Sequence, residues 1–317
     1  MRCITVFTLI CMNFASAQQI FFIRGDSVCS YSLSDKKCTL ISRLPPNIVS
    51  SSHEFSIAPG ATCVSYTKPV PTLKERWRRD IAVFTFADHK ETQLTDTPLR
   101  NAFGPLWSPD GRKLAFHCMF PTNNSSTDKI WKITFSDRNL RQFSTPFSDN
   151  SEQNVLYFTW FSNTELITLT GNSWEIIDTT GKIIQRDSLP ETTTQGVFDG
   201  HFSPNVLSIS PDRRFLAFIT PVDDEGSENF EIGPGYNAIF ICSRTNKSLI
   251  RVTDKSISIT SLPIWFPNST ELLFSAREAR KSHTQKYQPI NIYKLSIVAS
   301  TVTKLIPNAD YPTFTNE

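Results

Sequence analysis

The feature that most constrains the fold is a segment that recurs about every fifty residues. Its clearest copy is LWSPDGRKLAFHC, from Leu106 to Cys118, which is an apolar strand, a tight turn and a second apolar strand. Spacings of 50, 53, 49 and 56 residues separate the equivalent turn positions, which are Pro59, Pro109, Ser162, Pro211 and Pro267. A period of this length predicts a repeat architecture.

Each copy continues with two more strands. After a variable insertion we expect a third strand at 80–87, 130–136, 238–244 and 292–297. A turn and a fourth strand follow at 91–94, 142–143, 248–252 and 302–305. Four strands per unit is typical of a propeller blade.

The two ends of the sequence supply one further unit. Residues 19–24, 28–32 and 38–43 are predicted as second, third and fourth strands, and 311–316 resembles a first strand. Pairing the C-terminal strand with the N-terminal strands would close the ring and remove exposed sheet edges. The sequence therefore predicts an all-β, six-bladed propeller of four-stranded antiparallel blades, forming a single domain over 18–317.

The first seventeen residues have the pattern of a secretory signal peptide. Arg2 precedes a mostly apolar stretch, and Ala15-Ser16-Ala17 fits the small-residue cleavage site, with cleavage signals at Ala15 and Ala17. The apolar stretch is shorter than the roughly 20 residues that span a bilayer. We expect an exported protein, periplasmic or secreted, without a membrane span.

Charge and composition exclude some partners. The 32 Lys and Arg residues nearly balance the 30 Asp and Glu residues, for a net charge of +2. A nucleic-acid binder normally carries a marked excess of basic residues, so none is expected as a partner. Twenty Pro, eleven Gly and three Met favour many turns over a long-helix bundle. We expect a monomer.

Five cysteines follow the leader, and an odd number cannot pair completely. Cys29 and Cys38 flank a predicted hairpin and could form a disulfide, although a tight turn would put them out of direct register. Cys63 is predicted as a small buried residue. No C-x-x-C pair exists and the five histidines share no ligand spacing, so we predict no metal and no cofactor.

The repeat carries a resemblance to a known family. GPLWSPDGRKLAF, with the partial copies SISPDRRFLAF and PIWFPNSTELLFSA, resembles the WD40-like PD40 repeat of TolB propellers and of dipeptidyl peptidase IV relatives. The turn itself is a structural device in which Pro presets φ, Asp bonds nearby amides and Gly tolerates positive φ. Its residues here are Trp107, Ser108, Pro109, Asp110, Gly111, Pro211 and Asp212.

The resemblance implies a role as a protein-binding scaffold near the Tol-Pal envelope system, with a peptidoglycan-associated lipoprotein as the implied partner. TolB proteins also carry an N-terminal α/β domain, whereas here strands are predicted directly after the leader. Dipeptidyl peptidase relatives place a hydrolase domain after the propeller, and we expect none in this sequence.

We find no catalytic motif. The stretch from Gly171 to Glu175 lacks the second glycine of a G-x-S-x-G elbow. Gly25-Asp26-Ser27 is similar to the nucleophile block of GDS-type lipases but lacks a matching base, and a hairpin turn explains it. The same turn explains the Arg24-Gly25-Asp26 tripeptide, whose alternative is a receptor motif. No catalytic residue is therefore predicted.

Two basic insertions are candidates for partner binding. KPVPTLKERWRRD, at 68–80, and REARKSHTQKY, at 277–287, combine cations with aromatic side chains. Because Arg and Trp are favoured interface anchors, we name Arg76, Trp77, Arg78, Arg79 and Tyr287 as partner-binding candidates. Ordinary solvated loops are the alternative interpretation.

Three functions remain open: an envelope or extracellular scaffold, a glycan lyase or hydrolase with its site in the central channel, and a propeller with structural duties only. Histidines or carboxylates clustered at the channel mouth would favour the enzyme. An apolar or Arg-rich mouth would favour the scaffold.

Overall fold

The computed structural model describes most of the strand-forming sequence. The described residues are 19–51, 53–71, 78–95, 101–121, 126–134, 141–144, 157–170, 173–178, 182–188, 207–222, 236–278, 286 and 288–314. The predicted signal peptide, with Ala15 and Ala17, lies outside them. Within these ranges no helix has the length and apolar character needed to cross a membrane.

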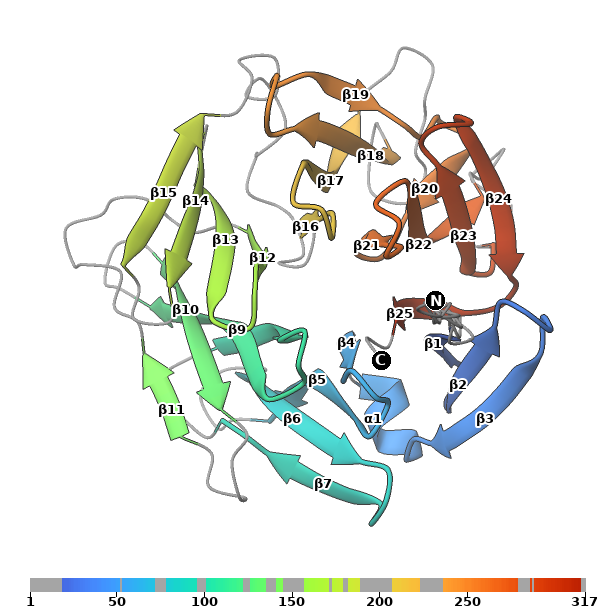
Figure 1. Cartoon of the computed structure of the whole chain (residues 1–317). Helices are drawn as coiled ribbons and strands as arrows, with labels where there is room; N and C mark the ends of the chain where they lie inside the picture. The colour runs from blue at the N-terminus through green and yellow to red at the C-terminus, as the bar shows by residue number, and fades with distance from the viewer. Residues whose placement is uncertain are drawn as a thin grey trace, which may run out of the picture.

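The described strands form antiparallel sheets arranged around a central axis, with the first strand of each sheet innermost (Figure 1). The first three sheets, written from the axis outward, are β25 (Asp310–Phe314), β1 (Gln19–Arg24), β2 (Ser27–Ser32) and β3 (Cys38–Arg43); β4 (His53–Ile57), β5 (Cys63–Val70), β6 (Arg78–Thr85) and β7 (Lys90–Gln93); and β8 (Asn101–Trp107), β9 (Lys113–Pro121), β10 (Ser126–Thr134) and β11 (Arg141–Ser144).

The other sheets continue around the ring in sequence order. They are β12 (Tyr157–Trp160), β13 (Glu165–Thr170), β14 (Ser173–Asp178) and β15 (Ile183–Ser188); β16 (Leu207–Ile209), β17 (Phe215–Val222), β18 (Tyr236–Ser243) and β19 (Leu249–Arg251); and β20 (Ile257–Ile259) and β21 (Ile264–Trp265) beside β22 (Glu271–Glu278), β23 (Asn291–Ser296) and β24 (Thr301–Ile306). A short helix, α1 (Pro46–Ser51), joins β3 to β4. This is a β-propeller.

The described residues show five of the six predicted four-stranded blades, so the prediction of six such blades needs correction at the remaining sheet. That sheet has five strands, because β20 and β21 pair with successive parts of the same neighbour, β22. Ile259 lies opposite Ala276 and Ile264 opposite Leu273, so five residue steps face three. The extra residues include Pro263, which has no N–H to give to a ladder.

The break between β20 and β21 has a counterpart in the register shifts of other inner strands. β4, β8 and β25 each contain a register shift, and each places a residue at positive φ three positions before the strand ends. These residues are Glu54 (φ 57°), Gly104 (φ 65°) and Tyr311 (φ 52°). A bulge bends a strand and increases its twist. In the five-stranded sheet, this bend is large enough to interrupt the strand.

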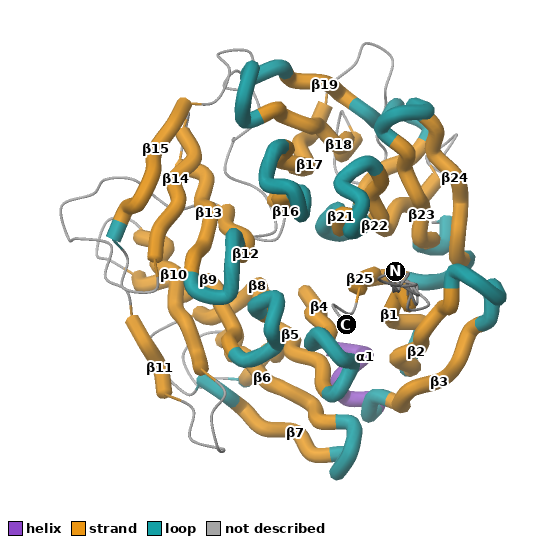
Figure 2. The backbone as a smooth tube through the Cα atoms, in the orientation of Figure 1, coloured by secondary structure: helices purple, strands orange, loops and turns teal. Residues whose placement is uncertain are grey.

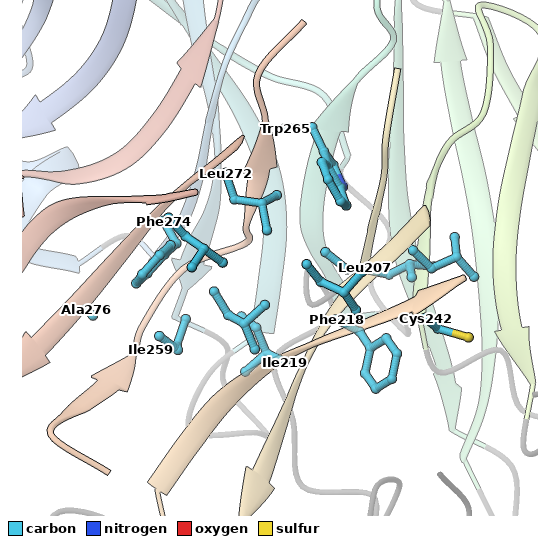
Figure 3. Close-up of a cluster of buried hydrophobic side chains, with 14 of the residues drawn as sticks. Leu207, Phe218, Ile219, Cys242, Ile259, Trp265, Leu272, Phe274 and Ala276 are labelled. Atoms are coloured by element: carbon cyan, nitrogen blue, oxygen red, sulfur yellow. The ribbon is translucent and has the colours of Figure 1, made fainter. Parts of the chain in front are cut away.

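The core lies between neighbouring sheets. Figure 3 shows one such layer, where Leu207 and Phe218 of one sheet face Trp265, Leu272 and Phe274 of the next. Aromatic side chains of the strands contribute much of this core; those with described side chains below 9% exposure include Phe84, Trp107, Phe116, Phe158, Trp160, Phe218, Trp265 and Phe274. Twisted sheets leave wide gaps that large flat side chains fill.

The predicted pairing of the C-terminal strand with the N-terminal strands is confirmed. β25 pairs antiparallel with β1, with Ile20 opposite Phe314 and Phe21 opposite Thr313 (Figure 1). Phe314 is 9% exposed and packs edge-on against Phe266, with ring centroids 4.6 Å apart. The last described strand therefore joins the first sheet and also contacts the core of the last.

The cysteines play no cross-linking role in the described structure. Cys29 lies opposite Leu40, while Cys38 lies opposite Tyr31, and both thiols are free. The Cys29–Cys38 disulfide considered from the sequence is absent, because the hairpin places the two residues on a diagonal. Burial raises the pKa of the Cys63 and Cys242 thiols to about 11, which keeps both protonated and unreactive at neutral pH.

Candidate functional site: the channel mouth

The inner strands end around a cavity of about 500 Å³ on the axis of the ring. Figure 2 shows the turns next to β4, β12, β16 and β21 converging on this axis. The wall contains the last two residues of each inner strand, and those at the next-to-last position are Ser56, Leu106, Thr159, Ser208, Ile264 and Thr313. Every sheet contributes to this cavity, which we call the channel mouth.

Tryptophan side chains join neighbouring sheets at the mouth. Trp107 and Trp160 each end an inner strand, and each indole Nε1–H donates to a carbonyl of the preceding sheet. The acceptors are the carbonyl oxygens of Ser56, at 3.1 Å, and Leu106, at 2.9 Å. These bonds fix the spacing of the sheets where they approach the axis.

The turn after each of two inner strands has the same hydrogen-bond pattern. Ser108 Oγ donates to Asp110 Oδ1 (2.6 Å) and accepts from Lys113 N (2.9 Å). Ser210 Oγ likewise donates to Asp212 Oδ1 (2.6 Å) and accepts from Phe215 N (2.9 Å). Serine and aspartate at these positions satisfy the backbone of a tight turn.

The turns also contact each other around the mouth. Asp110 N donates to Asn163 Oδ1 at 3.0 Å, and Lys113 Nζ donates to the Asn163 carbonyl at 2.8 Å. Asp212 N donates to Ser269 Oγ at 3.0 Å. Because two of the turns are each bonded to the turn of the next sheet, these parts of the rim are pre-organised.

Replacing Gly111 with alanine is expected to destabilise the protein by about 1 kcal/mol, because Gly111 has a φ of 67°, where a Cβ is strained. The added Cβ would lie 3.5 Å from Pro59, an ordinary contact, so strain is the main cost. Urea unfolding measures the change. Gly111→Asn should cost less, since Asn tolerates this region; an alanine variant as stable as the parent would contradict the turn assignment.

The described lining of the mouth carries positive charge and no negative charge. Arg213 is the one charged residue in its described lining, which contains no histidine and no acid. Its guanidinium carbon lies 4.4 Å from the centre of the Phe161 ring, and that of Arg244 lies 5.4 Å from the same ring. Burial, together with the nearby Arg213 charge, lowers the pKa of Arg244. The seam between β12 and β16 is therefore cationic.

Two acidic residues, Glu54 in β4 and Asp310 in β25, lie on inner strands but outside the lining of the mouth, and both have structural contacts. Glu54 Oε2 accepts from Thr67 Oγ1 (2.7 Å) and from Gly104 N of the next sheet (2.8 Å). Asp310 Oδ1 accepts from Tyr311 N at 2.8 Å, and burial raises the pKa of this carboxyl. No cluster of three or more His, Cys, Asp or Glu side chains suited to a metal occurs among the described residues.

The predicted partner-binding residues do not form one described surface. Arg76, Trp77 and Tyr287 lie outside the described residues. The Nε and Nη2 of Arg78 donate to buried Asp80 at 3.1 and 2.7 Å, so this side chain has a structural contact. Its role in partner binding stays a prediction. Arg79, its neighbour, is exposed.

The Arg24-Gly25-Asp26 tripeptide forms the β1–β2 turn. Arg24 Nη2 donates to the Pro307 carbonyl at 3.3 Å, and Asp26 Oδ2 accepts from Arg43 at 3.1 Å. Both charged side chains therefore have partners within the protein, in line with the turn interpretation.

Comparison with known proteins bears on the fold. No protein-family model matches the sequence, and none of the curated proteins does. Among solved structures, TolB from Agrobacterium tumefaciens is similar at 12% identity and a TM-score of 0.54, covering 92% of this protein and 89% of that one. A component of a nidogen/laminin complex is similar at 11% identity and a TM-score of 0.51, covering 94% and 98%.

A puromycin-hydrolysing peptidase from Mycobacterium tuberculosis is also similar, at 11% identity and a TM-score of 0.51. The match covers 93% of this protein but 44% of the peptidase. Identities this low show the propeller fold and nothing about activity. The class of protein that these comparisons support is therefore a β-propeller.

Proposed function

We propose that this protein is an exported, non-catalytic propeller that binds another protein at the channel mouth. The single observation that carries the proposal is the composition of the mouth: aliphatic, aromatic and hydroxyl side chains, one arginine and no acid or histidine in the described lining. Hydrolysis or elimination at a glycan needs titrating groups at the site. A rigid wall of aromatic and polar groups suits recognition.

The proposal includes a closed ring of six blades, in which β20 and β21 together form one inner strand. It also includes a monomer located in the periplasm or outside the cell, as the leader pattern indicates. A protein of the cell envelope, such as a peptidoglycan-associated lipoprotein, is the proposed partner, because the repeat resembles that of TolB. The partner is expected to present an extended segment, since the mouth is narrow and lined by strand ends.

The alternative is an enzyme that uses a carboxylate in the channel. Asp310 is the one observation in its favour, because its pKa is raised. We favour the scaffold because the Asp310 carboxylate accepts a backbone bond within β25, and Asp310 is not part of the mouth lining.

Affinity capture from the envelope of its own source, read by mass spectrometry, tests the proposal. The mature protein should retain a specific envelope protein, and Arg213→Glu should release it by reversing the charge at the mouth. Arg43→Glu is the matched control, since Arg43 is exposed and pairs with Asp26 in the β1–β2 turn. Retention of no protein above background would refute the scaffold, and equal retention by Arg213→Glu would refute the mouth as its binding surface.

A further inference from the structure

The seam between β12 and β16, two neighbouring inner strands, holds a pair of stacked arginines (Figure 1). Arg213 follows β16, is exposed and lines the channel mouth, whereas Arg244 lies in the β18–β19 turn and is partly exposed. Both guanidinium groups lie over one ring, that of Phe161, with their carbons 4.4 and 5.4 Å from its centre. Arg244 Nη1 also donates to the Arg213 carbonyl at 2.6 Å. Two cations are therefore held close together at the edge of the mouth.

Neither of these arginines forms an ion pair with an acid in the described part of the structure. The acids of this region have other partners. Asp187 pairs with Lys247, while Asp212 Oδ1 accepts from Ser210 Oγ at 2.6 Å and from Arg214 N at 3.1 Å. Because like charges at short distance repel each other, an anion that contacts both guanidinium groups would be bound favourably.

The backbone gives a second, independent reason to expect a use for the Arg213 side chain. Arg213 closes its turn as Gly111 closes the equivalent one, since each N–H donates to the carbonyl three residues earlier, at 2.7 and 2.8 Å. The two φ angles are 61° and 67°, a region in which a side chain is strained. The two other described turns of this kind carry small residues there, Ala61 and Ser269. A long cation at a position that glycine fills without strain points to function.

We propose that the stacked pair of Arg213 and Arg244 binds an acidic segment of the partner protein where that segment enters the mouth. A guanidinium group pairs well with a carboxylate, so two Asp or Glu side chains of the segment would neutralise the two arginines. The rest of the described lining is aliphatic, aromatic and hydroxyl, which suits the uncharged side chains of a peptide better than a uniformly sulfated glycan. This inference rests on the proposed function and names the chemistry of its partner.

Two synthetic peptides of equal length test the inference. One carries glutamate at alternate positions and the other carries glutamine there, and both are acetylated and amidated so that no terminus is charged. Fluorescence anisotropy with the full mature protein gives the two dissociation constants. At low salt the Glu peptide should bind at least about tenfold more tightly than the Gln peptide, and this advantage should shrink as salt is added.

Arg213→Gln and Arg244→Gln should each weaken binding of the Glu peptide about fivefold or more and leave the Gln peptide almost unaffected. Arg43→Gln is the matched control, because it removes the same charge from an exposed side chain that pairs with Asp26. Melting temperatures monitor the folding of each variant. Arg213→Gly should melt no lower than Arg213→Gln, since glycine is unstrained at this φ, and should bind the Glu peptide equally weakly.

The inference is wrong if the two peptides bind equally, or if Arg43→Gln weakens the Glu peptide as much as Arg213→Gln does. A heparin-derived tetrasaccharide that bound more tightly than the Glu peptide would replace the acidic protein segment with a sulfated glycan. If the Glu peptide does not bind while envelope capture still depends on Arg213, the acidic segment is wrong and the proposed function stands. If capture fails although the Glu peptide binds at the two arginines, the proposed function fails and the anion site stands.

Discussion

Deleting residues 311–317 is expected to lower the melting temperature by about 10 °C or more, or to prevent folding. The deletion removes most of β25, which supplies the inner strand of the first sheet. It unpairs the backbone of Ile20 and Phe21 and removes Phe314 from its contact with Phe266. Loss of a buried Phe side chain alone lowers the free energy of unfolding by about 3–5 kcal/mol. That is a large share of the roughly 5–15 kcal/mol by which typical domains are stable.

Deleting only 315–317 is the matched control, because it leaves β25 whole. This shorter deletion should melt within about 2 °C of the parent. Differential scanning calorimetry on both variants gives the comparison. If the longer deletion melted like the shorter one, β25 would not be what closes the ring.

Replacing Arg78 with alanine is expected to destabilise the protein by about 3–5 kcal/mol, because it leaves a buried carboxylate without its cation. Asp80 has a fully buried side chain, and that of Arg78 is 12% exposed. Gln93 Nε2 and Thr95 Oγ1 would still donate to Asp80, both at 3.0 Å, but neither carries charge. Chemical denaturation followed by intrinsic fluorescence measures the loss.

Arg79→Ala is the natural comparison, since Arg79 is adjacent in sequence and exposed. Its expected effect is within about 0.5 kcal/mol, as for most surface substitutions. Similar losses for the two variants would contradict the structural role of Arg78. A stable Arg78→Ala variant with weakened partner binding would instead favour a role for Arg78 in the interface.

The repeat and the ring closure could be predicted because their signals are local. The Pro-Asp-Gly turn at Pro109–Gly111 marks the repeat and its period. The apolar strands at the two ends of the sequence each need a partner strand, which predicts that they pair with each other. The break between β20 and β21 was not predicted. Its signal is Pro263, two residues before Trp265, but a proline near a strand end is equally typical of the start of a strand.

The site was harder to predict for a physical reason. The channel mouth brings together residues such as Ser56, Trp160 and Ser208, which are separated by whole repeats and look individually like ordinary strand residues. The ion pair of Arg78 was not predicted, although its partner, Asp80, lies two positions along the same strand, on the same face. An ion pair within an apparently basic run is visible only once burial is known.

Amide hydrogen exchange over residues 310–314 tests the central claim, a ring held shut by pairing between the two ends of the sequence. The account predicts that the amides of this segment that point toward β1 exchange much more slowly than those of an unstructured peptide, since β25 is an edge strand whose other amides have no partner strand. Exchange at the rate of an unstructured peptide, while β2 remains protected, would show that the tail does not pair and that the propeller is open.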